Sequence, residues 1–200
     1  TMKLYYAPGA CSLVVRIIIN EIGIKSDFES VNLMTKTTET GQNFLKINSK
    51  GAVPVLQLNN GDILTENAVI LQYLADQSNA TQLLPPTSNF ERYRVLEWVN
   101  YIATELHKGI GILFNPKITE TLKNDVFFPS IKSKLKFIDQ HLQNHAYLMG
   151  EHVTLPDAYL FVMLRWCTYF KFELKEWSNL HRYFTALQNR ASIQKSLQQE

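Results

Sequence analysis

The chain has 200 residues, of which 46% are hydrophobic and 19% charged, and its formal net charge at pH 7 is +2. This length buries a substantial core and has room for one large or two small domains. So small a charge gives no indication of a nucleic-acid partner or a membrane surface, and no apolar run approaches the length of a membrane span. The two cysteines, Cys11 and Cys167, lie too far apart in sequence for a disulfide framework. With few cysteines and no visible signal peptide, we expect a cytoplasmic protein.

Residues 1–80 alternate between strand and helix signals. The expected elements, in order, are a strand at Lys3–Tyr6, a helix at Ser12–Gly23, a strand at Phe28–Asn32, a short helix at Gly41–Ile47, a hairpin of strands at Val53–Leu58 and Asp62–Leu64, and a helix from Thr65. The order β-α-β-α-β-β-α predicts an α/β domain in which helices cover the faces of one small mixed sheet.

The polar segment Ser78–Asn89, which contains Pro85-Pro86, is the expected boundary before an all-helical domain over residues 88–200. We expect a long helix capped by Ser88 or Asn89, a second at Leu122–Leu142 interrupted at Pro129, a helix opened by a capping box at Thr154–Asp157 with a buried centre at Ala158–Trp166, and a last helix at Leu180–Arg190.

The most informative stretch is the turn between the first strand and the first helix. Pro8-Gly9 marks the turn, so Cys11 and Ser12 are expected at the helix N-terminus. Unpaired backbone N–H groups and the positive end of the helix dipole favour a thiolate there, which indicates a site that handles sulfur. The alternative is that Ser12 only caps the helix and Cys11 is a small buried side chain. On this stretch alone, the two interpretations have equal support.

Two further turns offer backbone groups for binding. A cis bond between Val53 and Pro54 would leave the backbone of Val53 open to an extended peptide, although an ordinary edge-strand proline is the alternative. Glu66 and Asn67 open a helix whose N–H groups would hold a carboxylate, or would simply be capped. If the three turns meet at one sheet, they form a site for a small acidic thiol peptide such as glutathione.

The second domain contributes a polar helix face. Asn100, Thr104 and His107 recur at i, i+4 and i+7, and Lys108 adjoins them. Such a face is usually only solvated, and His107 near a helix end is also explained as a C-terminal cation. Facing a cleft, His107 would instead hydrogen-bond a thiol or thiolate, and Lys108 would raise the local potential.

Other chemistry has little support. Val14 stands where a dithiol motif needs its second cysteine, which excludes two-cysteine disulfide exchange at Cys11 but not exchange by a single thiol. Cys167 falls within the buried helix and is expected to be inert. We expect no metal site, because no carboxylate pattern accompanies the dispersed histidines, His141, His145 and His152.

Over essentially its whole length the sequence resembles the cytosolic glutathione transferases, specifically the bacterial beta class. The resemblance is carried by the motifs Lys3–Ser12, Gly51–Leu56, Leu64–Asn67, Glu105–Gly109 and Thr154–Tyr159. It implies a thioredoxin-like N-terminal domain over residues 1–80, an all-helical domain that contributes the electrophile pocket, and a homodimer. It also implies glutathione as co-substrate and small electrophilic molecules as partners, with no nucleic acid and no membrane.

The resemblance implies roles for individual residues by position. Cys11 corresponds to the beta-class cysteine that contacts the glutathione sulfur, and His107 to the family's histidine near that sulfur, with Lys108 beside it. We further expect the donors at the helix start, Cys11 and Ser12, to favour the glutathione thiolate together with His107. Lys36 corresponds to the lysine that reaches the glycyl carboxylate, and Val53 before Pro54 corresponds to the residue that pairs with the cysteinyl backbone. Glu66 and Asn67 correspond to the γ-glutamyl site. Asn100 and Thr104 correspond to helix positions that line the site, and Asn100 is expected to reach the peptide of the neighbouring subunit. Two positions depart from the family pattern: Asn67 stands where serine or glycine is common, and Arg16 is expected to alter the edge of the cleft.

We therefore expect a glutathione transferase that activates the glutathione thiol for attack on electrophiles, a detoxification reaction. One alternative is a thiol-disulfide transferase that acts through a mixed disulfide between Cys11 and glutathione. Another is a non-catalytic carrier that binds hydrophobic molecules in an apolar cleft between the domains. The electrophile pocket would draw on apolar residues such as Phe114, Phe161 and Trp166.

Overall fold

The computed structural model describes residues 1–200, and its contacts divide the chain into two compact units. The first unit comprises residues 1–80 together with residues 191–200, and the second comprises residues 81–190. The predicted second domain ran to residue 200. The structure differs there because helix α10 (Ala191–Gln199), which was not predicted, packs against α1 (Leu13–Ile22) of the first unit.

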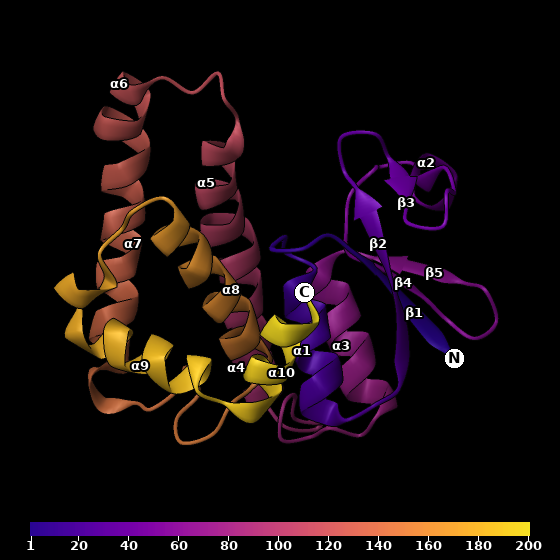
Figure 1. Cartoon of the computed structure of the whole chain (residues 1–200). Coiled ribbons are helices and arrows are strands. Elements are labelled where there is room, and N and C mark those ends of the chain that lie inside the picture. The colour runs from indigo at the N-terminus through magenta and orange to yellow at the C-terminus, as the bar shows by residue number, and fades with distance from the viewer. The chain divides into compact units, whose positions relative to one another are not determined.

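The first unit is built on a five-stranded sheet with the strand order β3-β2-β1-β4-β5 (Figure 1). Its strands are β1 (Met2–Tyr6), β2 (Ser26–Asn32), β3 (Thr37–Thr38), β4 (Val55–Gln57) and β5 (Ile63–Thr65). Strand β1 runs parallel to β2 and antiparallel to β4, and β3 and β5 form antiparallel edges. The predicted hairpin is confirmed by the β4–β5 pair. Strand β3 was missed because two residues are too short to show a periodicity.

Helices cover both faces of this sheet. Successive side chains of a strand point to opposite faces, so Leu4 and Tyr5 of β1, which are both buried, serve two different layers. Tyr5 packs against Phe44 of the short helix α2 (Phe44–Ile47). Helices α1 and α3 (Asn67–Gln77) lie side by side against the sheet (Figure 1). Helix α1 ends as predicted at Gly23, whose left-handed backbone lets its N–H bond to the carbonyl of Ile19.

The second unit is all-helical, as predicted. Its α-helices are α4 (Glu91–Tyr101), α5 (Lys108–Gly111), α6 (Glu120–Leu122), α7 (Phe128–His141), α8 (Leu155–Tyr169) and α9 (Ser178–Gln188), and 3-10 segments lie at Ile112–Phe114, Leu142–Asn144 and Leu174–Glu176. Two π-helical segments, η1 (Ile102–His107) and η3 (Lys123–Phe127), continue α4 into α5 and α6 into α7. Pro129, predicted to interrupt the second long helix, is the second residue of α7, just after η3. None of the helices combines the length and hydropathy that crossing a membrane requires.

Helix α8 is the buried centre of the second unit. The predicted capping box is confirmed: the fully buried carboxylate of Asp157 accepts hydrogen bonds from the backbone N–H of Thr154 at 2.8 Å and from the hydroxyl of Tyr183, on α9, at 2.6 Å. One side chain thus starts α8 and joins it to α9. Residues Ala158–Leu164 are buried, whereas Trp166, at the end of the predicted buried run, is only half-buried.

Glu29 of β2 is a buried carboxylate in the first unit. It accepts hydrogen bonds from Lys3 Nζ at 3.0 Å and from Thr40 Oγ1 at 2.6 Å. Burial alone would raise the pKa of Glu29, but hydrogen bonds from Thr38, Thr40 and Lys3 outweigh it and lower that pKa from 4.5 to about 2. The folded protein therefore holds a proton on Glu29 less tightly than the unfolded chain does.

A depressed carboxyl pKa stabilises the fold above the unfolded-state value, and the stabilisation is lost as the pH falls from 4.5 through about 2. We expect Glu29→Gln to lower the free energy of unfolding at neutral pH by about 2 kcal/mol and to flatten its pH dependence in this acidic range. Urea unfolding at a series of pH values measures both effects. Asp27→Asn, which removes an exposed carboxylate from the same strand, is the matched control. An equally steep pH dependence in Glu29→Gln would contradict the assignment.

Candidate functional site

The turn between β1 and α1 is tied together by Ser12. Its buried hydroxyl accepts a hydrogen bond from the N–H of Ala7 at 3.1 Å and lies 3.3 Å from the carbonyl oxygen of Ala7, to which it donates. Ser12 occupies the N-cap position of α1, but its side chain makes no capping hydrogen bond. The interpretation of Ser12 as a plain helix cap is therefore wrong. Its predicted role as a donor to a thiolate stays a prediction, since both hydrogen bonds of the hydroxyl lie inside the turn.

Cys11 is the point at which three turns meet. Its half-buried thiol donates to the carbonyl oxygen of Val53 at 3.3 Å, and its own carbonyl accepts from the side-chain amide of Asn67 at 3.2 Å. The peptide bond between Val53 and Pro54 is cis. The structure thus brings together the turn that carries Cys11, the Val53–Pro54 turn and the start of α3. From the sequence we expected this meeting only on the condition that the three turns belong to one sheet.

The start of α3 carries Glu66 and Asn67. Glu66, at the N-cap, has a left-handed backbone with φ of 76°, and its exposed carboxylate pairs with Lys50 Nζ at 2.6 Å. Lys50 also donates to the hydroxyl of Thr65 at 2.8 Å. This contact was not predicted, because Lys50 and Glu66 lie 16 residues apart and no local pattern joins them. Asn67 is 6% exposed, and its Oδ1 is a buried acceptor without a partner.

Lys36 lies on the same unit as Cys11. Its backbone is left-handed, with φ of 57°, and its half-buried side chain donates to the carbonyl oxygen of Gly51 at 2.8 Å. Gly51 comes two residues before Val53, so the ammonium group lies along the segment that also receives the Cys11 thiol. This position does not test the predicted role of Lys36 in binding a ligand carboxylate, which stays a prediction.

The second unit holds the remaining predicted polar residues. Asn100 and Lys108 are exposed, and the hydroxyl of Thr104 donates to the carbonyl oxygen of Asn100 at 2.9 Å. His107, the last residue of η1, forms a short hydrogen bond through Nδ1 with the hydroxyl of Tyr159 of α8. The sequence motif contained Tyr159, but nothing in it indicated this contact. The functions of the four polar residues stay predictions.

An aromatic cluster in the second unit contains two of the three residues predicted for an electrophile pocket. Phe114 is 49% exposed and contacts Trp166 with 5.0 Å between ring centroids. Tyr169 and Phe170, which were not predicted, also pack on Phe114. Phe161 is wrong for such a pocket, because it is fully buried and stacks on Phe184.

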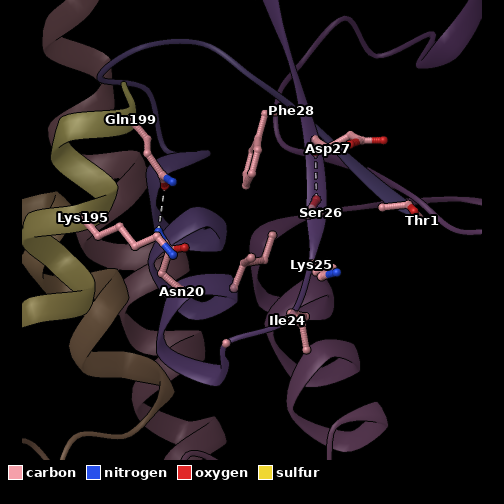
Figure 2. Close-up of a pocket in the computed structure, with 11 residues that line it drawn as sticks. Thr1, Asn20, Ile24, Lys25, Ser26, Asp27, Phe28, Lys195 and Gln199 are labelled. Carbon is pink, nitrogen blue, oxygen red and sulfur yellow. Dashed lines mark hydrogen bonds between the residues drawn. The ribbon is translucent and has the colours of Figure 1, made fainter.

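A hollow of about 480 Å³ in the first unit lies away from these residues. Figure 2 shows it between the end of α1, the beginning of β2 and helix α10, and none of the predicted site residues lines it. Its walls mix polar and apolar groups without a cluster of chemically reactive side chains. No group of three or more His, Cys, Asp or Glu residues is arranged to hold a metal ion.

The two units match two family models. Residues 4–82 match "Glutathione S-transferase, N-terminal domain", and residues 101–191 match "Glutathione S-transferase, C-terminal domain". A curated relative, "Glutathione S-transferase GstA" of Escherichia coli O157:H7, is 40% identical over 199 residues, which cover 100% of this chain and 98% of that protein.

Solved structures give the same result. A sphingomonad glutathione S-transferase complexed with glutathione is 34% identical with a TM-score of 0.94, and the match covers 98% of each chain. The bacterial beta-class glutathione S-transferase of Sphingomonas chungbukensis is 35% identical with a TM-score of 0.93, again over 98% of each chain. These matches confirm the resemblance inferred from the sequence motifs, including that to the beta class.

The two cysteines are expected to differ sharply in reactivity. Cys11 is half-buried, whereas Cys167 is fully buried, and burial raises the pKa of the Cys167 thiol to about 12. We expect iodoacetamide to alkylate Cys11 in the folded protein and to leave Cys167 unmodified until urea unfolds the chain. Peptide mass spectrometry over time measures both rates. Equal labelling of the two thiols in the folded protein would contradict the assignment.

Proposed function

The chain belongs to the glutathione S-transferase family, and from that membership and the geometry around Cys11 we propose that it activates the thiol of glutathione for attack on small electrophiles. The observation that carries the proposal is the meeting of the Cys11 thiol, the Val53 carbonyl and the Asn67 side chain at the start of α1. A relative of similar fold was solved with glutathione bound, which supports the same peptide as the co-substrate here.

The proposed mechanism begins with the glutathione thiol, which is mostly protonated at neutral pH. The positive end of the α1 dipole, the thiol of Cys11 and the imidazole of His107 would favour its thiolate, and each unit of pKa lowering corresponds to about 1.4 kcal/mol. The thiolate then forms a carbon–sulfur bond with the electrophile. In a substitution the leaving group departs with its bonding electron pair, and in an addition the anion formed on the electrophile takes up a proton. Ser12 acts in this scheme as a positioning residue that fixes the turn.

The remaining predicted residues would hold the peptide. In the proposal, Val53 pairs with the cysteinyl backbone, Glu66 and Asn67 bind the γ-glutamyl end, and Lys36 neutralises the glycyl carboxylate. Asn100, Thr104 and Lys108 would line the site from the helical unit, with Asn100 reaching the peptide of a neighbouring subunit. We also propose a homodimer and a cytoplasmic location. Light scattering of the purified protein tests the first, and a monomer would contradict it.

A second candidate function is thiol-disulfide transfer, which the accessible position of Cys11 favours. The Cys11 thiolate would attack a glutathionylated substrate, form a mixed disulfide with glutathione and expel the substrate thiolate. A glutathione thiolate would then attack this mixed disulfide, releasing glutathione disulfide and the Cys11 thiolate. Each exchange forms one disulfide and breaks one, so a single cysteine is sufficient.

The Cys11→Ala variant distinguishes these functions. We expect it to retain aryl-halide conjugation within about fivefold of wild type and to lose reduction of a glutathione mixed disulfide by about a hundredfold, because only the second reaction needs a bond to Cys11. Calorimetric titration with glutathione and mass spectrometry for an adduct on Cys11 complete the test. Loss of both activities would instead indicate covalent chemistry in both. Absence of turnover by wild type with electrophiles and disulfides would leave only a ligand carrier.

The contribution of His107 is tested by His107→Gln. If the imidazole stabilises the thiolate, the variant should lower kcat/KM for conjugation by about tenfold and raise the apparent pKa of its pH profile. Tyr159→Phe, which removes the hydroxyl bonded to His107 Nδ1 but keeps the ring, is the companion variant. An unchanged pH profile in His107→Gln would remove His107 from the mechanism.

A further inference from the structure

Arg16 interrupts the apolar run of α1, and the structure buries it. The residue is 2% exposed, and its guanidinium carbon lies 4.4 Å from the ring centroid of Tyr6 and 4.0 Å from that of Phe28. This position contradicts the expectation that Arg16 alters the edge of a cleft. A guanidinium so far from water needs a counter-ion within the protein.

Glu200 supplies that counter-ion. Its Oε2 lies 2.8 Å from Arg16 Nε, and the Glu200 side chain is 8% exposed. Gln199 adds a neutral acceptor for Arg16 NH1 at 3.4 Å, while Arg16 NH2 is buried with no acceptor. The cation is therefore incompletely satisfied, and removal of Glu200 would leave its charge without its carboxylate partner.

The second oxygen of the same carboxylate contacts the turn that carries Cys11. Glu200 Oε1 accepts a hydrogen bond from the backbone N–H of Gly9 at 3.1 Å. Gly9 has a left-handed backbone, with φ of 73°, and comes two residues before Cys11. Glu200 thus bridges a buried cation and the outer part of the turn, whereas Ser12 ties the inner part to Ala7.

Helix α10 holds Glu200 in place. The amide of Asn20 on α1 donates to Gln199 Oε1 at 2.9 Å, a contact drawn in Figure 2, and to the hydroxyl of Ser196 at 2.8 Å. Ser192 donates to a carboxylate oxygen of Glu21, and Ile193 is buried. Glu200 directly follows this docked helix, so its carboxylate is not carried by a mobile tail.

We infer that Glu200 is a positioning residue for Cys11. Its carboxylate is held by the ion pair with Arg16 and accepts the hydrogen bond from the Gly9 N–H. This bond keeps the turn in the shape that directs the Cys11 thiol toward Val53. The inference rests on the proposed function for its link to catalysis. It assigns no contact between Glu200 and substrate. Its direct consequence is that the accessibility of Cys11 depends on a side chain that lies 191 residues from Gly9 in the sequence.

The test compares Glu200→Ala, Glu200→Gln and the double variant Arg16→Gln/Glu200→Gln with wild type. Ser192→Ala is the matched control, because it removes a contact between α10 and α1 without touching the turn. Two quantities are measured well below the melting temperature of each variant: the iodoacetamide rate constant of Cys11, with Cys167 as the internal marker of unfolding, and the KM for glutathione separately from kcat.

We expect Glu200→Ala to alkylate at Cys11 about fivefold faster than wild type and to raise the KM for glutathione by a similar factor with a smaller change in kcat. The double variant keeps an acceptor for the Gly9 N–H and balances the lost charge, so its Cys11 rate should return to within about twofold of wild type. Glu200→Gln alone should lie between the two.

Two results would overturn the inference: a Cys11 rate in Glu200→Ala equal to that of wild type, or the same acceleration in Ser192→Ala, which would show that docking of α10 alone matters. If wild type fails to bind glutathione, the proposed function fails, but the Cys11 rates still decide the role of Glu200. If Glu200→Ala exposes Cys167 as well, the role of Glu200 is decided by comparing the double variant with wild type. A Cys11 rate in the double variant more than twofold above that of wild type would then contradict the inference.

Discussion

Hydrogen bonds across the turn between β1 and α1 determine where the Cys11 sulfur lies. The turn has no regular secondary structure, so its shape depends on side chains that bond to its backbone. The hydroxyl of Ser12 joins both backbone groups of Ala7, and the amide of Asn67 joins the carbonyl of Cys11. A reactive group on a loop is held accurately only when the surrounding scaffold fixes the loop in this way. The sheet and α1 provide that scaffold.

Local signals were enough to predict the elements that carry the site. The turn before α1, the hairpin and the opening of α3 each show turn or capping residues beside an apolar run, and their order along the chain predicts one mixed sheet that they share. The same signals could not assign the bonds of Ser12, because a serine at a helix start is explained equally well by capping. In the folded protein the hydroxyl is bonded to Ala7 instead.

Long-range contacts account for most of what the sequence did not reveal. The partner of Arg16 lies 184 residues away in the chain. Helix α10 has nine residues and buries only Ile193 and Ser196, so few apolar residues mark it in the sequence. Phe161 could not be placed for a different reason. An apolar run such as that of α8 predicts that its side chains are buried but not the direction in which each points. The sequence therefore did not distinguish Phe161, which stacks on Phe184, from Trp166, which reaches the aromatic cluster.

The π-helical segment η1 ends at His107 and continues directly into α5. A π segment holds one residue more than the α-helical turn it replaces, and successive residues of an α-helix are about 100° apart around its axis. If the same six residues wound as a regular α-helix, α4 would be unchanged, but the imidazole and everything after it would rotate to another side of the helix. The direction of the ring thus depends on the π-helical hydrogen bonding of this six-residue stretch. A homologue with the same histidine and an uninterrupted helix would present it to different neighbours.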